Sequence, residues 1–314
     1  MKQLILHIGY PKTATTALQK SIFSQLQGDA WEVISPEQRD GVISNLEMKR
    51  VLQGDLPALQ EQVRSSTKNW FISIEGLVFD CIRDMCDGRR FRPRSWELTL
   101  KAIDEFYRAN GFDDIRILVW LRAQDELLHS VYAQSFTNFF SNISDFDSVS
   151  KYIKRILTAS SSRDPLVFAY HFSNILVPII DLYGRNRLNV MFYEEIEANA
   201  GREIEKLGSL IGFHFENRLE RTNVRRLGED IKMTRPSTLW DILLGVKKRY
   251  LGWLKLPVGL KRLLGNLSAK VVFGDPKQVS LTATDRKLIM AAFSEDNREL
   301  GVRLGLELPE KYVP

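Results

Sequence analysis

The stretch of sequence that decides the fold is residues 4–16, LILHIGYPKTATT. Residues 4–8 form a short, mainly apolar run that a glycine and a proline bring to an end, which is typical of a buried strand. Apolar residues then recur at every fourth position over 18–26, the spacing of one face of a helix. The sequence therefore predicts a strand, a tight loop, and a helix that begins near Thr15.

The loop between these two elements has the chemistry of an anion site. Gly9 lets the chain turn sharply, and the successive backbone N–H groups of residues 12–16 can converge on one anion. The helix dipole adds partial positive charge there, and Lys12 adds a full charge. The hydroxyls of Thr15 and Thr16 can also donate, so we expect a phosphate or sulfate at this loop. The second glycine of the Walker A pattern is missing, which disfavours a magnesium-dependent nucleotide hydrolase.

Further strands and helices alternate along the rest of the chain. Turn residues end each segment, and we expect Asp125 to cap the helix that follows the third strand. This alternation favours an α/β fold with a mainly parallel central sheet flanked by helices, formed as a single domain over residues 1–314. The segments read as strands are 70–74, 115–121 and 188–193, and those read as helices are 96–110 and 203–211.

Composition narrows the classes of protein to consider. The chain has 314 residues, two cysteines and four histidines. No zinc-ligand spacing occurs, and no run reaches the roughly 18 apolar residues of a membrane span. We expect a cytoplasmic protein in a reducing compartment. The net charge of +5 suits anionic ligands, nucleic acid or an anionic membrane surface, but no recognised nucleic-acid motif is present.

Residues 10–16, YPKTATT, resemble the P-K-[TS]-[GA]-T-[TS] signature of the PAPS-dependent sulfotransferases. This family moves a sulfonate group from 3′-phosphoadenosine-5′-phosphosulfate (PAPS) to an acceptor and releases PAP. The resemblance implies a P-loop-like architecture, no metal, and a lysine at position 12 that contacts the leaving phosphate oxygen. Alanine at position 14 departs from the commoner glycine. The donor-binding residues implied on this loop are Pro11, Lys12, Thr13, Ala14, Thr15 and Thr16.

A second motif lies in the middle of the chain. In this family, an arginine at a strand end and a serine eight residues later bind the 3′-phosphate of the donor. Arg122 ends the strand at 115–121, and Ser130 follows at that spacing. A guanidinium fork and a hydroxyl suit a phosphate dianion. An arginine at a strand end is, by itself, also a common partner in a salt bridge.

Glu75, at the end of the strand at 70–74, is the candidate catalytic base. Ligands of open α/β sheets bind at the carboxyl edge of the strands, where this carboxylate could take a proton from an acceptor hydroxyl or amine. It resembles the strand-end glutamate of the carbohydrate, or heparan-type, branch of the family. The alternatives are a turn cap or an ion pair for Glu75, and His129 or His7 as the base. His7 lies inside the first strand and is expected to be a core residue or one that supports the site without contacting the ligand.

A cationic insertion is expected at residues 237–274. Leucine, tryptophan and basic residues alternate over 237–265, which indicates amphipathic helix. It forms either a helical subdomain over the acceptor cleft or a peripheral membrane contact. The acceptor, a small molecule or a glycan, is not specified by the sequence. The alternatives to sulfonate transfer are a nucleotide-dependent small-molecule kinase and a non-catalytic anion- or nucleic-acid-binding protein.

Overall fold

The structure of the chain is a computed structural model. The chain divides into two compact units, of which the first is Met1–Leu127, Thr158–Val224 and Leu288–Pro314, and the second is Leu128–Leu157 and Arg225–Lys287. The single-domain organisation expected from the sequence stays a prediction. The described residues are 2–10, 12–35, 61, 63–75, 94–136, 146, 148–159, 161–164, 166–217, 219, 231–234 and 276–313.

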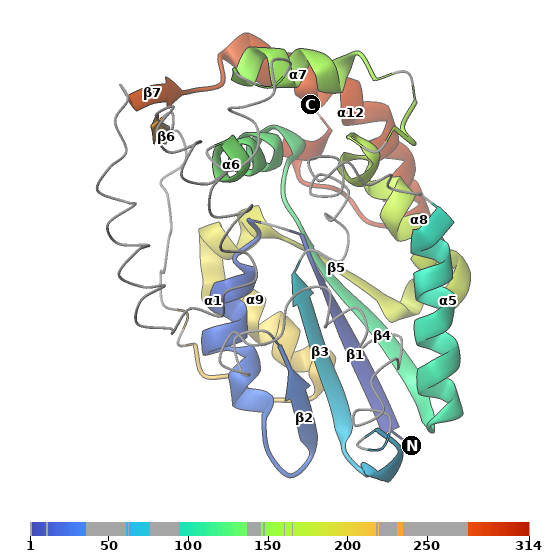
Figure 1. Cartoon of the computed structure of the whole chain (residues 1–314). Coiled ribbons are helices and arrows are strands. Elements are labelled where there is room, and N and C mark those ends of the chain that lie inside the picture. The colour runs from blue at the N-terminus through green and yellow to red at the C-terminus, as the bar shows by residue number, and fades with distance from the viewer. Residues whose placement is uncertain are drawn as a thin grey trace, which may run out of the picture. The chain divides into compact units, whose positions relative to one another are not determined.

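The first unit is built on a five-stranded sheet in the order β2-β3-β1-β4-β5, and all of its neighbouring strands are parallel (Figure 1). The expected parallel sheet is therefore confirmed, and the short edge strand β2 was not predicted. In the register, Gly9 at the end of β1 pairs with Glu75 on one side and Trp120 on the other. The strands are β1 (Lys2–Gly9), β2 (Trp31–Ile34), β3 (Asn69–Glu75), β4 (Phe112–Leu121) and β5 (Leu188–Phe192).

Helices cover both faces of this sheet. On one face, α1 (Thr15–Ser21), η1 (Phe23–Leu26) and α9 (Tyr193–Ile211) pack on alternate strand residues such as Ile5 and Leu118. On the other face lie α5 (Arg94–Ala109) and α8 (Phe172–Tyr183), where the Trp96 indole N–H donates to the carbonyl of Ile175. Figure 1 shows α1 and α9 to the left of the sheet and α5 to its right. Successive side chains of a strand point to opposite faces of the sheet, so each central strand packs against both layers of helices and is buried on both faces.

Two local expectations are wrong. The helix after β5 begins at Tyr193, ten residues before the expected start, and it is kinked at Asn199, where φ is −155°. Asp125 does not cap the helix after β4. That helix, α6 (Gln124–Phe136), begins one residue earlier, so Asp125 lies in its first turn and accepts a hydrogen bond from the Glu126 amide.

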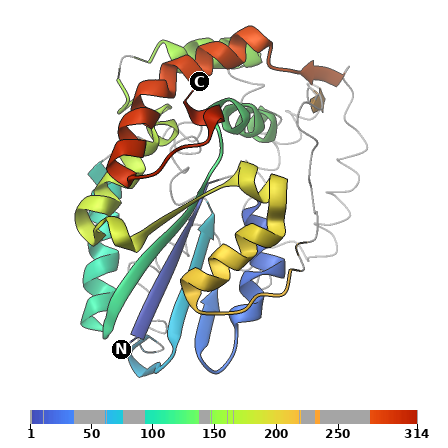
Figure 2. The ribbon, with the colours of Figure 1, turned by 180° about the vertical axis from the view of Figure 1, so that it is seen from behind.

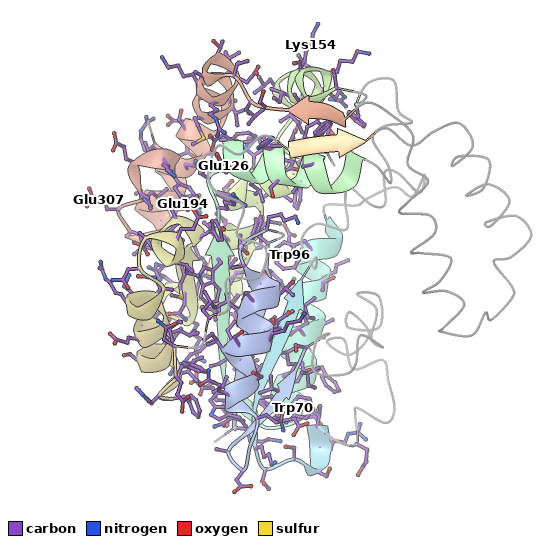
Figure 3. The ribbon with its side chains drawn as sticks, turned by 90° about the vertical axis from the view of Figure 1, so that its left-hand side faces the viewer. Trp70, Trp96, Glu126, Lys154, Glu194 and Glu307 are labelled. Atoms are coloured by element: carbon purple, nitrogen blue, oxygen red, sulfur yellow. The ribbon has the colours of Figure 1, made fainter. Side chains whose placement is uncertain are left out.

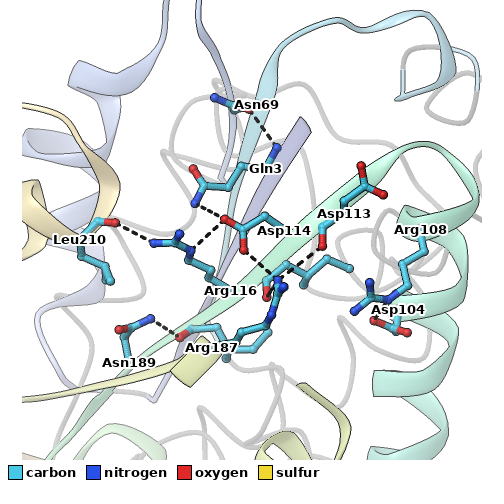
Figure 4. Close-up of polar contacts among 12 residues, drawn as sticks. Gln3, Asn69, Asp104, Arg108, Asp113, Asp114, Arg116, Arg187, Asn189 and Leu210 are labelled. Carbon is cyan, nitrogen blue, oxygen red and sulfur yellow. Dashed lines mark hydrogen bonds and ion pairs between the residues drawn. The ribbon is translucent and has the colours of Figure 1, made fainter. Parts of the chain in front are cut away.

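A polar cluster joins the elements at the amino ends of the strands (Figure 4). The carboxylate of Asp114 on β4 accepts hydrogen bonds from the Gln3 side chain at 3.1 Å, Arg116 at 3.0 Å and Arg187 at 2.8 Å. Arg116 also donates to the carbonyl of Leu210 near the end of α9. One carboxylate therefore links β1, β4, α9 and the turn before β5, at the end of the sheet opposite the loop after β1.

The second unit contains the remainder of α6, α7 (Val149–Leu157) and a two-stranded antiparallel sheet of β6 (Ile231–Thr234) and β7 (Pro276–Val279). Tyr132 packs on Tyr152 and donates to the carbonyl of Phe146. The predicted insertion at 237–274 lies outside the described residues. Among the residues described, no helix is long and apolar enough to cross a membrane.

The remaining helical elements are short, except for one. The long helix α12 begins in the second unit and continues into the first. These elements are η3 (Phe168–Tyr170), η4 (Arg185–Arg187), α12 (Ala283–Leu304) and η6 (Glu310–Tyr312).

Candidate functional site

The loop after β1 turns through two non-glycine residues in the left-handed region. Lys12 has φ 65° and Ala14 has φ 59°, whereas Gly9 is still part of β1. The expectation that Gly9 makes the turn is therefore wrong. Left-handed residues within a short loop turn successive backbone amides toward one side, which is the geometry of an anion-binding nest. The left-handed conformation of Ala14 also explains why glycine is the easier residue at this position.

Two threonines hold the loop from its inner side. The Thr13 hydroxyl donates to the carbonyl of Tyr10 at 2.7 Å, and the Thr15 hydroxyl lies 3.3 Å from the same oxygen. Both side chains are buried, with Thr13 fully so. These hydroxyls support the shape of the loop. The roles of these threonines, and of Thr16 in the first turn of α1, toward a ligand stay predictions, and Pro11 lies outside the described residues.

Arg122 connects the two sequence motifs. Its Nη1 donates to the carbonyl of Lys12 at 3.0 Å, and its Nη2 lies 3.4 Å from the carboxylate of Glu126. The guanidinium carbon lies 4.6 Å from the centre of the Tyr193 ring, a cation–π contact. Its Nε is buried and has no hydrogen-bond partner among the described residues. Because a guanidinium has five N–H donors, the side chain retains donor capacity beyond these two contacts.

Sequence reasoning missed the surroundings of Arg122. Glu126 was detectable, because it stands four residues after Arg122 at the start of a helix, the spacing of a helical ion pair. No local signal marked Tyr193, because its part in the site depends on α9 beginning at that residue. Figure 3 shows Glu126 and Glu194 toward the same end of the molecule and Trp70 toward the opposite end.

The structure gives each of the other predicted site residues a position in the fold. Glu75 ends β3 level with Gly9, so its backbone is next to the start of the loop, and its side chain lies outside what the structure describes. Ser130 lies on α6, eight residues after Arg122, within the second compact unit. His129 is buried on the same helix. The roles of Glu75 as base and of Ser130 as a phosphate ligand therefore stay predictions.

His7 is a core residue, as expected. It is fully buried, and its Nδ1 lies 2.7 Å from the hydroxyl oxygen of Ser73, which also accepts a hydrogen bond from Gln19 at 2.8 Å. Its ring packs edge-on against Phe23 and Trp120. Burial lowers the pKa of His7 to about 3, so the imidazole is neutral at physiological pH and supports the packing between β1, β3 and α1.

The ionisable residues of the described ranges form no cluster of three histidine, cysteine, aspartate or glutamate side chains that could hold a metal ion. Among the described residues, Lys12 in the loop and Arg122, which donates to its carbonyl, bring positive charge to this place. The site can therefore bind an anion through backbone amides, one ammonium and one guanidinium.

Comparisons with known proteins give a fold but no close relative. No family model matches the sequence, and no curated protein matches it. A sulfotransferase from Alicyclobacillus acidocaldarius matches with a TM-score of 0.51 and 13% identity, covering 99% of each chain. At this identity the likeness shows a shared fold: the chain has the α/β architecture of a sulfotransferase, with a five-stranded parallel sheet.

Two further solved structures match less closely. Mouse SULT7A1 complexed with PAP has a TM-score of 0.40 and 11% identity, covering 69% of this chain and 61% of that one. The sulfotransferase domain of the Synechococcus PCC 7002 olefin synthase has a TM-score of 0.36 and 13% identity, covering 88% and 98%.

The left-handed conformation of Ala14 predicts that Ala14→Gly stabilises the protein. An alanine in this region costs about 1–2 kcal/mol, and the larger entropy of glycine in the unfolded chain offsets part of the gain. We expect the free energy of unfolding to rise by about 0.5–1 kcal/mol, measured by urea denaturation. Ala292→Gly, at an exposed position within α12, is the control and should lower it by a similar amount. A loss of stability in both variants would contradict the argument.

Burial of His7 predicts a specific dependence of stability on pH. The pKa is about 3 in the folded protein and about 6.5 in an unfolded chain, so between these values only the unfolded chain binds the proton. The free energy of unfolding should therefore decrease as the pH is lowered across this window, by about 1.4 kcal/mol per pH unit. His7→Asn removes this contribution, so its stability difference from the wild type should narrow as the pH falls. Parallel curves would be inconsistent with a buried neutral imidazole, and the same change at exposed His214 is the control.

Proposed function

We propose that this protein is a PAPS-dependent sulfotransferase that transfers a sulfonate group to a hydroxyl or amine of an acceptor, a carbohydrate or glycoconjugate in the favoured case. The observation that carries the proposal is the hydrogen bond from Arg122 to the carbonyl of Lys12. It joins the two motifs that resemble the family at one edge of a parallel sheet, where ligands of open α/β sheets bind. The sulfotransferase fold of the chain supports sulfonate transfer in general.

The arrangement of positive charge supports a donor with phosphates at two positions. The loop offers backbone amides and the Lys12 ammonium for the 5′-phosphosulfate. Arg122 directly follows the adjacent strand β4 and would hold the 3′-phosphate, together with Ser130 in the family pattern. The guanidinium is largely buried, and its Nε has no partner among the described residues, which favours an anion that accepts more than one hydrogen bond.

The proposed reaction is an in-line displacement at sulfur. The acceptor oxygen or nitrogen forms a bond to sulfur while the bond from sulfur to the phosphate oxygen breaks, and PAP leaves with the extra negative charge. Lys12 and the loop amides stabilise that charge as it develops on the departing oxygen. Glu75, at the end of β3 beside the loop, takes the proton of the acceptor. The protein thereby supplies electrostatic stabilisation on the donor side and a base on the acceptor side.

The proposals for the acceptor and for the cellular setting rest on the sequence, through Glu75 and the segment at 237–265. The glutamate at position 75 favours a carbohydrate, by resemblance to the heparan-type branch. The segment at 237–265, outside the described residues, is the candidate for peripheral membrane contact of a cytoplasmic enzyme. A screen of sulfate acceptors with labelled PAPS would identify the acceptor class.

The role of Arg122 predicts a change in ligand selectivity. In Arg122→Ala, affinity for PAP should fall more than affinity for adenosine-5′-phosphosulfate, which lacks the 3′-phosphate. The differential loss should be about 1.5–3 kcal/mol, the typical contribution of a charge-assisted hydrogen bond. Calorimetry with both ligands, with a chelator present, measures it.

Arg116→Ala is the matched control, because this arginine lies within β4, six residues before Arg122, and its side chain bonds to Asp114 in the polar cluster at the amino ends of the strands. It should leave both affinities unchanged. Equal losses for the two ligands in Arg122→Ala would show that Arg122 only supports the loop. Binding of ATP with magnesium, but not of PAP, to the wild type would contradict the proposed function.

Because Glu75 is proposed as the base and Lys12 as a donor-binding residue, Glu75→Gln and Lys12→Ala should have different effects. Loss of a general base costs about 10²–10⁴ in rate, so Glu75→Gln should lose turnover and keep its affinity for PAP. Lys12→Ala should lose both. Single-turnover transfer from labelled PAPS, alongside calorimetry, separates the two effects. Glu205→Gln, at an exposed position on α9, controls for the loss of a carboxylate, and a normal rate in Glu75→Gln would exclude Glu75 as the base.

A further inference from the structure

The last turn of the chain is buried at the carboxyl end of the sheet. Tyr312, in η6, is fully buried, and its ring packs against Phe192 at the end of β5 and Phe172 at the start of α8. Figure 2 shows the C-terminus at the opposite end of the sheet from the N-terminus. The end of the chain therefore reaches the edge of the sheet that carries the candidate donor site.

The hydroxyl of Tyr312 connects this turn to the residue after Arg122. It donates to Oε2 of Glu194 at 2.9 Å, while Oε1 of the same carboxylate accepts the backbone N–H of Ala123 at 2.9 Å. A carboxylate that accepts one donor at each oxygen is fixed in its orientation. Burial, and then the Glu194 carboxylate, raise the pKa of Tyr312 well above its ordinary value, so the hydroxyl stays protonated and able to donate.

A second connection runs from the backbone of the same turn. The carbonyl of Tyr312 accepts a hydrogen bond from the Asn297 side chain at 2.8 Å. Asn297 and Gln124 are fully buried, and their amides exchange hydrogen bonds at 2.8 and 3.1 Å. Tyr312 is thus tied, through one side chain in each case, to the two residues that follow Arg122 in the chain.

The ring of Tyr312 also reaches toward the loop after β1. Phe172, on which it packs, lies edge-on against Tyr10 with ring centres 5.4 Å apart. Tyr10 supplies the carbonyl to which Thr13 and Thr15 are bound. The end of the chain is therefore in indirect contact with both parts of the candidate donor site.

We infer that Tyr312 is a positioning residue for the candidate donor site. Through Glu194, it holds the backbone next to Arg122 so that the guanidinium stays against the loop after β1. Packing alone requires only the ring, and a phenylalanine would supply it. The hydroxyl adds a buried polar group that is costly to leave without a partner. Its partner, Glu194, holds the backbone amide of Ala123, the residue after Arg122. This inference rests on the proposed function for its effect on the donor, since Arg122 is the proposed 3′-phosphate ligand.

The test is Tyr312→Phe, compared with Tyr183→Phe. Tyr183 is also buried, and its hydroxyl donates to a backbone carbonyl, that of Leu100, at 3.3 Å, so both variants lose one hydroxyl and one hydrogen bond. Hydrogen exchange should quicken over residues 122–127 and 10–18 in Tyr312→Phe and stay unchanged there in Tyr183→Phe. Affinity for PAP should fall about tenfold in Tyr312→Phe, a difference of about 1.4 kcal/mol, with a smaller loss for adenosine-5′-phosphosulfate.

The outcomes separate this inference from the proposed function. Unchanged exchange over both segments, or an unchanged ratio of the two affinities when the wild type binds both ligands, overturns the inference. If the wild type binds neither ligand while the exchange responds as expected, the proposed function fails and the positioning role of Tyr312 stands. Glu194→Gln provides the second variant, because an amide cannot accept both donors without loss, and it should act in the same direction as Tyr312→Phe.

Discussion

The hydrogen bond between the Arg122 guanidinium and the carbonyl of Lys12 sets the geometry on which the candidate site depends. Lys12 and Ala14 both adopt left-handed backbone conformations, which cost a non-glycine residue about 1–2 kcal/mol each. Such a loop persists only where its surroundings over-determine it. Here Arg122 fixes it from the neighbouring strand, while Thr13 and Thr15 fix it from within. These contacts hold the loop in one conformation, and a site that binds a charged group gains from groups that are already held in place.

The charges around Arg122 explain how a guanidinium is kept largely buried at the sheet edge. Its side chain is only 13% exposed, and Glu126 supplies the opposite charge that such burial requires. The face of Tyr193 covers the guanidinium, and Glu194 holds the adjacent backbone amide. Because these partners come from α6 and α9, the direction of Arg122 depends on the packing of both helices at the ends of β4 and β5. A change in either helix would therefore alter the candidate site without changing the residues of its two motifs.

Sequence patterns were sufficient for four of the five strands of the parallel sheet, all except β2, and for the first helix. The apolar runs at 4–8, 70–74 and 115–121 all lie within observed strands, because strands buried on both faces have continuous apolar sequences. The boundaries of helices were less certain. Residues 193–202 carry few apolar side chains, so their periodicity gave no helix, although Tyr193 begins one. Asp125 is a residue type favoured at helix caps, but the backbone begins α6 one residue before it.

The sequence by itself determined the class of fold, the lysine and hydroxyl groups that make residues 10–16 a candidate anion site, and the position of Arg122 directly after its strand, because each of these depends on neighbours within a few residues. Only the tertiary structure decided that the Arg122 side chain binds the Lys12 carbonyl, that Thr13 and Thr15 face inward, and that Tyr312 reaches the turn after β4 through Glu194. The contacts of Arg122 and Tyr312 join residues more than 100 positions apart in the chain, and they depend on the order in which the parallel strands pair. The threonine contacts are local, but they depend on the left-handed turn of the loop, which the sequence pattern did not specify. Local patterns record which residues prefer to be buried or charged, whereas strand order and helix packing decide which of them meet.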